Sequence, residues 1–578
     1  MRIDISEFGL QEGQEADAAL AVFRALAASR TADNPELVFP KGSYHFFPER
    51  AAEGSYYITN HDQGGTRRTA FPILNRNGLI IDGQGSEFIF HGPMIPFILD
   101  NSANITLRNF TIDWARPMFE QGIVTAASET SFDIQLAANA DYEMRSDGLY
   151  FEFGGGRLPV WGFHDIDPIN RTHAHQSGDR ISWNSFKKLK LSEAGPGLIR
   201  VTGDIRHIPR VGNRITMRFG RRENPGIFIK GSDKVEIGNV TLHHAPGMGL
   251  VAQRSSDITL RGFDVRLNPD SGRMVTATAD ATHFTNCRGT ILIEDCLFEN
   301  QLDDPCNVHG IYVRVSERIS EDTLLVRFMH EMTVGIDFTG MGDIVRFINN
   351  ESLLPYAEAS VRSAELVNEE YMLITFDQPL PSAVGEYHVI ENVTWNPDLT
   401  VRRCTVRANR ARGFLITTPG RVLLEHNTIS APGAGIKISG DANSWYESGA
   451  VQDVTIRYNT FLDCNYCYPD WGRAVIDIDP EIENPESHEE CYHRNIRIQE
   501  NVFDTFESPL VYGHSIDGFT FTGNVVRRSG NYPMHGGRPY TIELRAARNT
   551  VITGNRFEGG EPRAALLENA EVNLPVES

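Results

Sequence analysis

Two short acidic segments contain the residues best suited to chemistry. Residues 279–284, ADATHF, contain Asp280, and residues 301–310, QLDDPCNVHG, contain the adjacent pair Asp303 and Asp304. Carboxylates gathered in one small patch push one another's pKa values apart, so that one holds a proton while another stays ionised. Glycoside hydrolysis uses such a set, because an acid protonates the leaving oxygen while a base activates water. The three aspartates are therefore predicted to be catalytic.

Two simpler roles for these segments stay open from the residues alone. Asp-Asp pairs and Asn-rich turns are common turn formers, and acidic clusters also bind Ca²⁺ through oxygen ligands. His283 and His309 can tune the carboxylates or bind hydroxyl groups, although a single histidine is more often a packing residue. Trp114, Trp445 and Trp471 can stack on the apolar face of a sugar, and each also fits an ordinary packing role.

A nine-residue pattern that recurs ten times predicts the elements that hold these residues. The copies begin at Asn104, Lys234, Asp257, Thr290, Asp398, Arg421, Asp453, Asn495, Gly518 and Asn549. Apolar and polar residues alternate in each copy, which is typical of a β-strand, and three start-to-start spacings equal 23 residues. That spacing is too short for a propeller blade. A strand repeat of this length buries its apolar side only by stacking, so we predict a right-handed parallel β-helix with one coil per repeat.

The same spacing links the acidic segments to the repeat. Asp280 precedes Asp303 by 23 residues, so the two should occupy equivalent points of neighbouring coils, roughly 4.8 Å apart along the axis. Adjacent residues such as Asp303 and Asp304 normally point to opposite faces of a strand, and burying a bare carboxylate is costly. Pro305 indicates a bulge or a strand edge, which can turn both carboxylates toward one outer groove.

Two long gaps interrupt the array, between the first and second copies and between the fourth and fifth. Both gaps contain alternating segments bounded by Gly, Asn and Pro, which predict antiparallel β-barrel-like insertions. Before the first copy, residues 17–28 are expected to form a helix that caps the core, and residues 38–46 the first strand. The expected parts are 1–115 (cap and first coils), 116–223 (first insertion), 224–310 (coils with the acidic site), 311–396 (second insertion) and 397–578 (C-terminal coils).

Composition limits the class of protein and its partners. The chain of 578 residues is 40% hydrophobic and 22% charged, a balance typical of folded globular proteins. Its 76 acidic and 54 basic residues give a net charge of −22, a field that repels nucleic acid and anionic membranes, so neither is expected as a partner. No stretch approaches the roughly 18 to 20 apolar residues that a bilayer-spanning helix needs. Seven cysteines, none before Cys287, argue against a disulfide framework.

Longer motifs add a family resemblance. The run DGQGSEFIFHG from Asp82, the two acidic segments, RFMHEMTVG from Arg327 and ISGDANSWYESGAVQDVTIRYNTF from Ile438 together resemble glycoside hydrolase family 110, the exo-acting α-1,3-galactosidases. The resemblance extends from about residue 36 to 560. It implies a β-helix with two small β-barrel insertions, an inverting mechanism, no metal or other cofactor, and release of terminal α-1,3-linked galactose. The three functional aspartates of the family fall on Asp280, Asp303 and Asp304.

The acidic trio is also similar to that of the polygalacturonases, which are β-helical and inverting. This similarity implies that Asp303 is the general acid, and that Asp280 and Asp304 position and deprotonate the nucleophilic water. An inverting enzyme needs its acid and base about 6.5 to 9.5 Å apart to admit that water. Further residues predicted to bind substrate are His309, His283, Asn307, Trp445, Glu447 and Trp471.

The expected partner is a galactose-terminated oligosaccharide or glycan: blood-group-B-type, a linear α-1,3-galactoside or an algal galactan. A homo-oligomer stays open. Family members are usually secreted or periplasmic, but no signal peptide is recognised, because Asp17 and Arg24 interrupt the Ala-rich run of residues 16–28. Two alternative functions are a β-helix polysaccharide lyase, which would need a Lys or Arg base and usually Ca²⁺, and a glycan-binding solenoid without catalysis.

Overall fold

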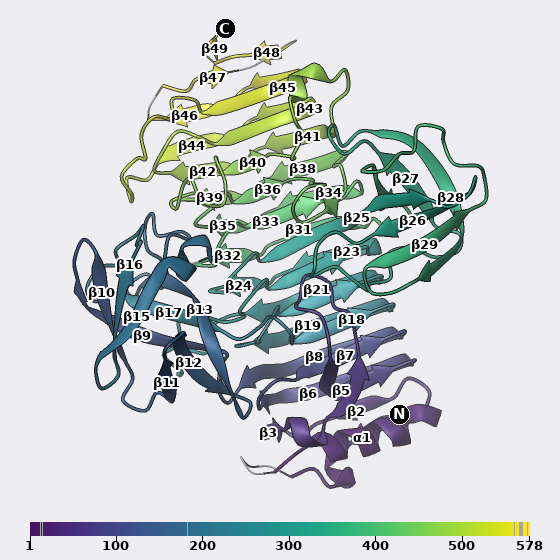
Figure 1. The fold of residues 1–578 in the computed structure, drawn as a ribbon, viewed down its shortest axis with the longest axis vertical. Coiled ribbons are helices and arrows are strands. Elements are labelled where there is room, and N and C mark those ends of the chain that lie inside the picture. The colour runs from purple at the N-terminus through teal and green to yellow at the C-terminus, as the bar shows by residue number, and fades with distance from the viewer. Residues whose placement is uncertain are drawn as a thin grey trace.

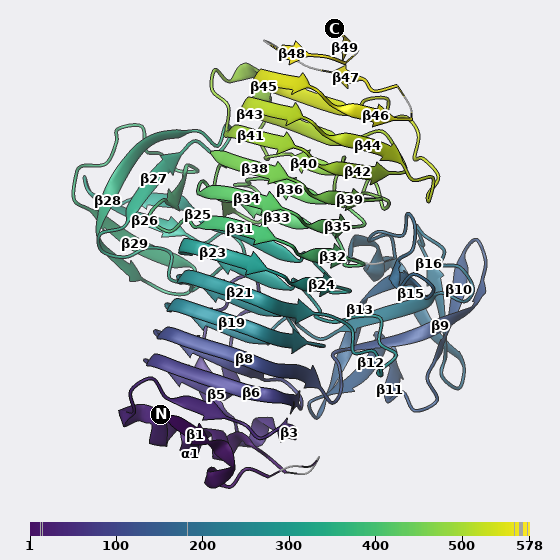
Figure 2. The same ribbon diagram turned by 180° about the vertical axis from the view of Figure 1, so that it is seen from behind.

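The computed structural model describes residues 1–11, 13, 16–181, 183–559, 561–565, 570–574 and 576–577. Most of the chain forms short β-strands stacked in parallel, with one inserted antiparallel sheet on each side of the stack (Figure 1; Figure 2). The predicted all-β class with two barrel-like insertions is therefore confirmed. Among the described residues, no helix is both long and apolar enough to cross a membrane.

All ten copies of the sequence repeat lie in one ladder of parallel strands, named here the repeat ladder. Its strands are β8 (Ala103–Trp114), β19 (Asp233–Leu242), β21 (Ser256–Val265), β23 (Arg288–Glu294), β31 (Asp398–Arg402), β34 (Arg421–Glu425), β38 (Asp453–Arg457), β41 (His493–Gln499), β43 (Val511–Thr522) and β45 (Ile542–Thr553). Neighbouring copies pair in register, for example Val235 with Ile258 and Val422 with Val454. These paired apolar residues are buried, so the alternation in the sequence marks the core side of the ladder.

Two further ladders of parallel strands complete the stack. The site ladder contains β18 (Ile227–Lys230), β20 (Leu250–Gln253), β22 (Thr282–Thr285), β25 (Cys306–Arg318), β33 (Phe414–Thr417), β36 (Ile436–Ile438) and β40 (Ile476–Ile478), and continues into β43 and β45. The third ladder contains β24 (Leu297–Glu299), β32 (Thr405–Arg407), β35 (Thr428–Ser430), β39 (Thr460–Leu462), β42 (Val502–Thr505), β44 (Val525–Arg528) and β46 (Arg556–Glu558). The chain visits the three ladders in turn and returns to the first one strand further along.

The N-terminal end of the stack is covered by helix α1 (Ala19–Ala28), whose residues Val22 and Ala25 are buried in the main core (Figure 1). The helix begins at Ala19 rather than at residue 17, because the side chain of Asp17 accepts a hydrogen bond from the Ala19 backbone N–H at 2.9 Å. The expected strand at residues 38–46 is wrong as a single element. Two short strands, β2 (Glu36–Val38) and β3 (Ser43–Phe46), lie there instead, each paired with β6 (Asn77–Phe90).

The first insertion leaves the stack after β8 and returns at β18. Among the described residues, nine strands form its antiparallel sheet: β9 (Phe119–Ala127), β10 (Ser131–Leu136), β11 (Tyr142–Arg145), β12 (Gly148–Phe153), β13 (Gly156–Asp167), β14 (Thr172–His173), β15 (Leu189–Gly195), β16 (Leu198–Gly203) and β17 (Arg214–Phe219). Strand β17 lies between β9 and β13 and delivers Arg218 and Arg222 to the stack.

The second insertion begins within β25, which leaves the site ladder and pairs with β26 (Thr323–Arg327) and β30 (Val389–Asn392). Strands β27 (Ile344–Ile348), β28 (Pro355–Leu366) and β29 (Tyr371–Phe376) complete a closed antiparallel ring in the order β25-β26-β29-β28-β27-β30. Its interior is a separate apolar cluster that includes Val326, Phe347 and Ile374.

Candidate active site

The three predicted aspartates line one cavity of about 340 Å³ on the site ladder. Asp280 lies just before β22, and Asp303 and Asp304 lie in the bend that leads into β25. The coils stack so that the backbone N–H of Ala281 donates to the carbonyl oxygen of Asp304 at 2.8 Å. The 23-residue spacing thus places the two acidic segments on neighbouring windings. The bend before Pro305 leaves both carboxylates of the pair at the same cavity.

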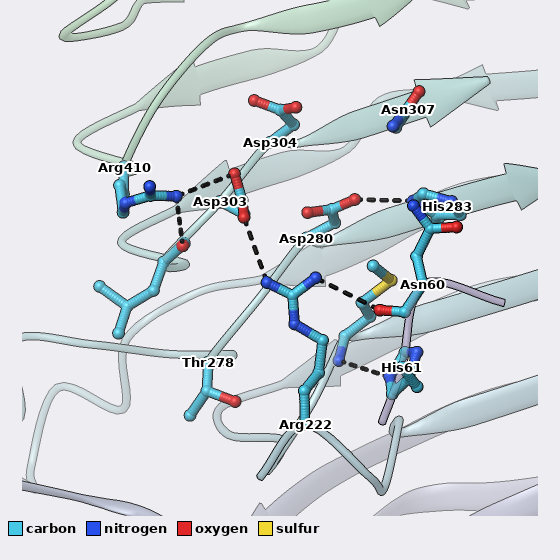
Figure 3. Close-up of polar contacts among 12 residues, drawn as sticks. Asn60, His61, Arg222, Thr278, Asp280, His283, Asp303, Asp304, Asn307 and Arg410 are labelled. Carbon is cyan, nitrogen blue, oxygen red and sulfur yellow. Dashed lines mark hydrogen bonds and ion pairs between the residues drawn. The ribbon is translucent and has the colours of Figure 1, made fainter. Parts of the chain in front are cut away.

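Arginine side chains contact two of the three carboxylates, and Figure 3 shows Arg222 and Arg410 at Asp303. Asp303 lies 3.3 Å from Nη2 of Arg222 and 3.1 Å from Nη1 of Arg410. Asp304 accepts hydrogen bonds from Arg412 through Nε at 3.1 Å, Nη2 at 2.6 Å and the backbone N–H at 3.0 Å. Asp303 has 15% of its side chain exposed against 1% for Asp304, so Asp303 is the more accessible of the pair.

The third carboxylate faces an imidazole instead of a guanidinium. Oδ2 of Asp280 lies 2.7 Å from Nδ1 of His283 (Figure 3). Nε2 of His283 lies 2.8 Å from Nε2 of His309. Both histidines are buried behind the cavity wall. Asp280 therefore lines the cavity while its Oδ2 contacts the buried ring of His283, which in turn contacts His309.

These surroundings separate the three pKa values. Burial, followed by the negative charge of Asp303, raises the pKa of Asp280 to about 8. Burial also raises the pKa of Asp304 to about 7, although the Arg412 guanidinium opposes this shift. Burial acts in the same direction on Asp303, but the guanidinium groups of Arg410, Arg222 and Arg412 outweigh it and leave the pKa below its ordinary value. At neutral pH the site thus holds protons and a carboxylate anion side by side, as acid–base catalysis requires.

The residues predicted to bind substrate fall into two groups. Asn307, Trp445 and Glu447 line the cavity. Two amide nitrogens hold Glu447, since Asn307 Nδ2 lies 3.3 Å and Asn60 Nδ2 3.2 Å from its Oε1. The ring of Trp445 stacks on His330 at a centroid distance of 4.3 Å, so a loop of the second insertion supports this wall.

His283, His309 and Trp471 do not line this cavity. His283 and His309 lie behind Asp280. The indole N–H of Trp471 donates to Asp179 at 2.9 Å, and Asp179 accepts hydrogen bonds from Arg410 at 2.6 and 3.0 Å. Because Arg410 contacts Asp303, Trp471 is linked to the Asp303 carboxylate through Asp179 and Arg410.

Sequence reasoning missed the cations and several other cavity residues. These are Asn60, Arg222, Met248, Arg412, Leu415, Lys437, Ser439, Gly440, Asp441, Ser444, Asp479 and Glu481. Arg412 carried a usable signal, because it follows the repeat copy at Asp398 by 14 residues, as Asp304 follows the copy at Thr290 by 14, although the second insertion lies between the two copies. Arg222 follows the first insertion and Asn60 lies in an N-terminal loop, and neither position belongs to a repeat copy.

Comparison with known proteins agrees with this architecture. Models of GLAA-B β-barrel domain I and GLAA-B β-barrel domain II match residues 120–215 and 323–390. The chain is 36% identical to alpha-1,3-galactosidase B of Bacteroides thetaiotaomicron, over 96% of this chain and 91% of that protein. It is 33% identical to alpha-1,3-galactosidase A of Shewanella woodyi, again over 96% and 91%.

Among solved structures, the family 28 exopolygalacturonase of Yersinia enterocolitica aligns with a TM-score of 0.43 and 9% identity, over 96% of this chain and 78% of that one. An agreement of that size supports no conclusion about function. The relatives at more than 30% identity extend over nearly the whole chain. The chain therefore belongs to the α-1,3-galactosidase family, glycoside hydrolase family 110.

Proposed function

We propose that this protein releases terminal α-1,3-linked galactose from glycans by single-step hydrolysis with inversion at the anomeric carbon. Family membership makes the protein a glycoside hydrolase. The observation that supports the reaction is the single cavity in which Asp280, Asp303 and Asp304 meet with different protonation. A cavity of about 340 Å³ is near the lower end for ligand sites, which suits the end of a glycan rather than a continuous chain.

We assign the acid to Asp303 and the base to Asp280 with Asp304. Asp303 is the most exposed of the three, so it is best placed to reach the glycosidic oxygen of a bound sugar. Because its own pKa is lowered, Asp303 must first take a proton from within the cavity, and the adjacent Asp304, whose pKa is raised to about 7, is the source. The guanidinium groups of Arg222 and Arg410 then stabilise the anion that remains after Asp303 has passed this proton to the leaving oxygen. Asp280 and Asp304 hold the attacking water on neighbouring windings. Asn307, Trp445 and Glu447 supply contacts to the sugar.

We also infer that the three ladders are the faces of a right-handed parallel β-helix, because crossovers between parallel strands of one sheet are right-handed in nearly all proteins. We keep as a proposal the domain limits with insertions at 116–223 and 311–396, and the strands that leave the stack after β8 and within β25 support it. Both insertions contribute to the catalytic centre, the first through Arg222 and the second through the loop of His330.

The direct test is incubation with α-D-galactosyl-(1→3)-D-galactose and NMR of the anomeric protons during the reaction. We expect free galactose to appear first as the β-anomer. Early α-galactose would exclude inversion, an unsaturated product absorbing in the ultraviolet would indicate a lyase, and binding without any product would indicate a glycan-binding protein. Asp303→Asn serves as the reference variant, with an unchanged circular dichroism spectrum and turnover of the disaccharide lowered about 10²–10⁴-fold.

A further inference from the structure

A chain of close contacts leaves the cavity at Asp280 and returns to it at Glu447. Its steps are Asp280 Oδ2 to His283 Nδ1 at 2.7 Å, His283 Nε2 to His309 Nε2 at 2.8 Å, and His309 Nε2 to Glu447 Oε1 at 3.5 Å. Both ends line the catalytic cavity, whereas the side chains of His283 and His309 are only 1% and 0% exposed. The two rings therefore connect two cavity carboxylates along a path that water does not reach.

The hydrogen bonds fix where the protons of this chain lie when both rings are neutral. Nδ1 of His309 lies 2.7 Å from the carbonyl oxygen of Gly310, which can only accept, so this nitrogen is protonated. Nε2 of His309 is then an acceptor, and Nε2 of His283 must donate to it. Nδ1 of His283 is in turn an acceptor, so the proton in its 2.7 Å contact belongs to Asp280. The burial that raises the pKa of Asp280 and lowers that of His283 acts in the same direction.

This arrangement leaves a proton on the residue assigned as the base. A carboxylic acid cannot deprotonate water, so Asp280 must lose its proton before it can act. Its second oxygen faces the cavity, which also contains Asp303, Arg222 and Arg412. The negative charge of Asp303 disfavours the Asp280 anion, whereas the positive charges of Arg222 and Arg412 favour it. The buried rings offer the other route, because an imidazole can accept a proton on one nitrogen while it releases one from the other.

We propose that His283 and His309 form a reversible proton store that frees Asp280 to act as the base of the hydrolysis. The proposal rests on the proposed function. The Asp280 proton moves to Nδ1 of His283 while the Nε2 proton of His283 moves to Nε2 of His309. The products are the Asp280 carboxylate, a neutral His283 and a His309 cation. Glu447, 3.5 Å from the stored charge, stabilises this cation.

The cycle closes without a net change in protons. The Asp280 carboxylate takes a proton from water as the water oxygen bonds to the anomeric carbon. The bond from that carbon to the leaving oxygen breaks, and Asp303 gives its proton to the leaving oxygen. The proton that came from water first leaves Asp280 through cavity water and restores the proton that Asp303 gave up. The stored proton then returns from His309 through His283 to Oδ2 of the Asp280 carboxylate.

The store is tested with His309→Gln, which can still accept the hydrogen bond from His283 but cannot hold a second proton. We expect kcat for the disaccharide to fall at least 10-fold, with KM changed less than about threefold, since loss of acid–base function typically costs 10²–10⁴-fold. Hydrolysis of α-galactosyl fluoride should fall equally, because this substrate needs the base but no acid. The matched control is His91→Gln, which breaks a ring contact of 2.9 Å with His45 far from the cavity and should keep wild-type kcat.

A second measurement uses no activity. Nitrogen-15 NMR of the histidine rings in the wild-type protein should show His283 protonated on Nε2 and unprotonated on Nδ1. A protonated Nδ1 in the resting protein, or wild-type kcat in the His309→Gln variant, would overturn the store. A wild-type protein that hydrolyses no α-1,3-galactoside would instead overturn the proposed function, while the ring-nitrogen spectra still decide where the proton lies.

Discussion

Arginine and histidine side chains give three chemically identical carboxylates three different environments. Asp303 contacts two guanidinium groups, Asp304 forms an ion pair with one, and Asp280 contacts an imidazole. Proximity to opposite charge favours an anion, whereas burial without it favours the protonated acid. The differences among the three pKa values are therefore set by the neighbouring groups rather than by the carboxyl groups themselves.

The roles assigned to the aspartates can be tested with a substrate whose leaving group needs no proton. Asp303→Asn should lose about 10²–10⁴-fold activity on the disaccharide, the range expected when a general acid is removed, but retain hydrolysis of α-galactosyl fluoride. Asp280→Asn should lose activity on both substrates, because each needs an activated water. Initial rates of galactose and fluoride release give the comparison. Equal losses on the fluoride in both variants would remove Asp303 from the role of acid.

The raised pKa of Asp280 has a cost in stability that depends on pH. Between the unfolded pKa of about 3.9 and the folded value of about 8, the folded chain keeps a proton that the unfolded chain has lost, so stability falls as pH rises through this window. Asp280→Asn removes the titration and keeps a donor for His283. Relative to wild type, its free energy of unfolding should gain about 1.4 kcal/mol for each pH unit in that window.

Denaturant unfolding at pH 5 and pH 7.5 checks this expectation. The control is Asp270→Asn, an exposed aspartate on a turn, whose effect on stability should be the same at both pH values. A difference between Asp280→Asn and wild type that stays constant with pH would show that Asp280 titrates normally in the folded protein.

The sequence identified the aspartates but not their partners, for a physical reason. Repeats report equivalent positions on successive windings, which is why Asp280 and Asp303 could be placed together. Arg412 lies opposite Asp304, but the second insertion separates the two residues along the chain. Arg222 and Asn60 reach the cavity from loops outside the repeat, where contacts depend on tertiary packing alone.

A row of asparagines stabilises the corner between the repeat ladder and the third ladder. The row occupies the same position on successive windings and consists of Asn427, Asn459, Asn501, Asn524 and Asn555. From Asn459 onward, the side-chain oxygen of each asparagine accepts two hydrogen bonds from the asparagine before it in the row, one from the backbone N–H and one from Nδ2. Their Nδ2 groups also donate to backbone carbonyls of the corner, such as that of Ile456. The row satisfies polar backbone groups that the buried corner would otherwise leave without partners.

Replacing the middle member of this row should destabilise the stack. Asn501→Ala removes the side-chain partner of the Asn459 backbone N–H and of the Ile456 carbonyl oxygen, and a buried group left without a partner costs about 1–3 kcal/mol. We expect a loss of at least that size in the free energy of unfolding, measured with guanidinium. Asn170→Ala, which removes an exposed asparagine, should change stability by less than about 0.5 kcal/mol. Equal effects of the two variants would contradict a structural role for the row.

The same regularity explains which elements were predictable. Ten alternating copies predicted ten strands and their stacking, because burial on one side of a strand repeats with every winding. The N-terminal segment lies before the first repeat copy at Asn104, so the repeat could not indicate where its strands begin and end. Pro40 and Gly42 divide residues 36–46 into two short strands that pair with different parts of β6, which alternation within a single copy could not reveal.

At the scale of the molecule, the first insertion helps to hold the side chains around Asp303 in place. Asp179 belongs to the first insertion, yet it accepts two hydrogen bonds from Arg410 of the stack and one from Trp471. Arg410 in turn contacts Asp303 at 3.1 Å. The position of Asp303 is therefore linked to a contact between two residues, Asp179 and Arg410, that are 231 residues apart in the chain.

Asp179→Asn tests this dependence. The amide pairs weakly with Arg410, so Arg410 and Asp303 should lose their alignment and kcat/KM for the disaccharide should fall by up to about 100-fold. Asp133→Asn, which removes an ion pair with Arg200 elsewhere on the same inserted sheet, should leave kcat/KM unchanged. Similar losses in the two variants would mean that the sheet acts through general stability rather than through Arg410.

The residues that line the catalytic cavity extend from Asn60 to Glu481. A nascent polypeptide therefore cannot complete the cavity before the ribosome has translated Glu481. Shorter products of interrupted translation or early proteolysis lack part of the wall.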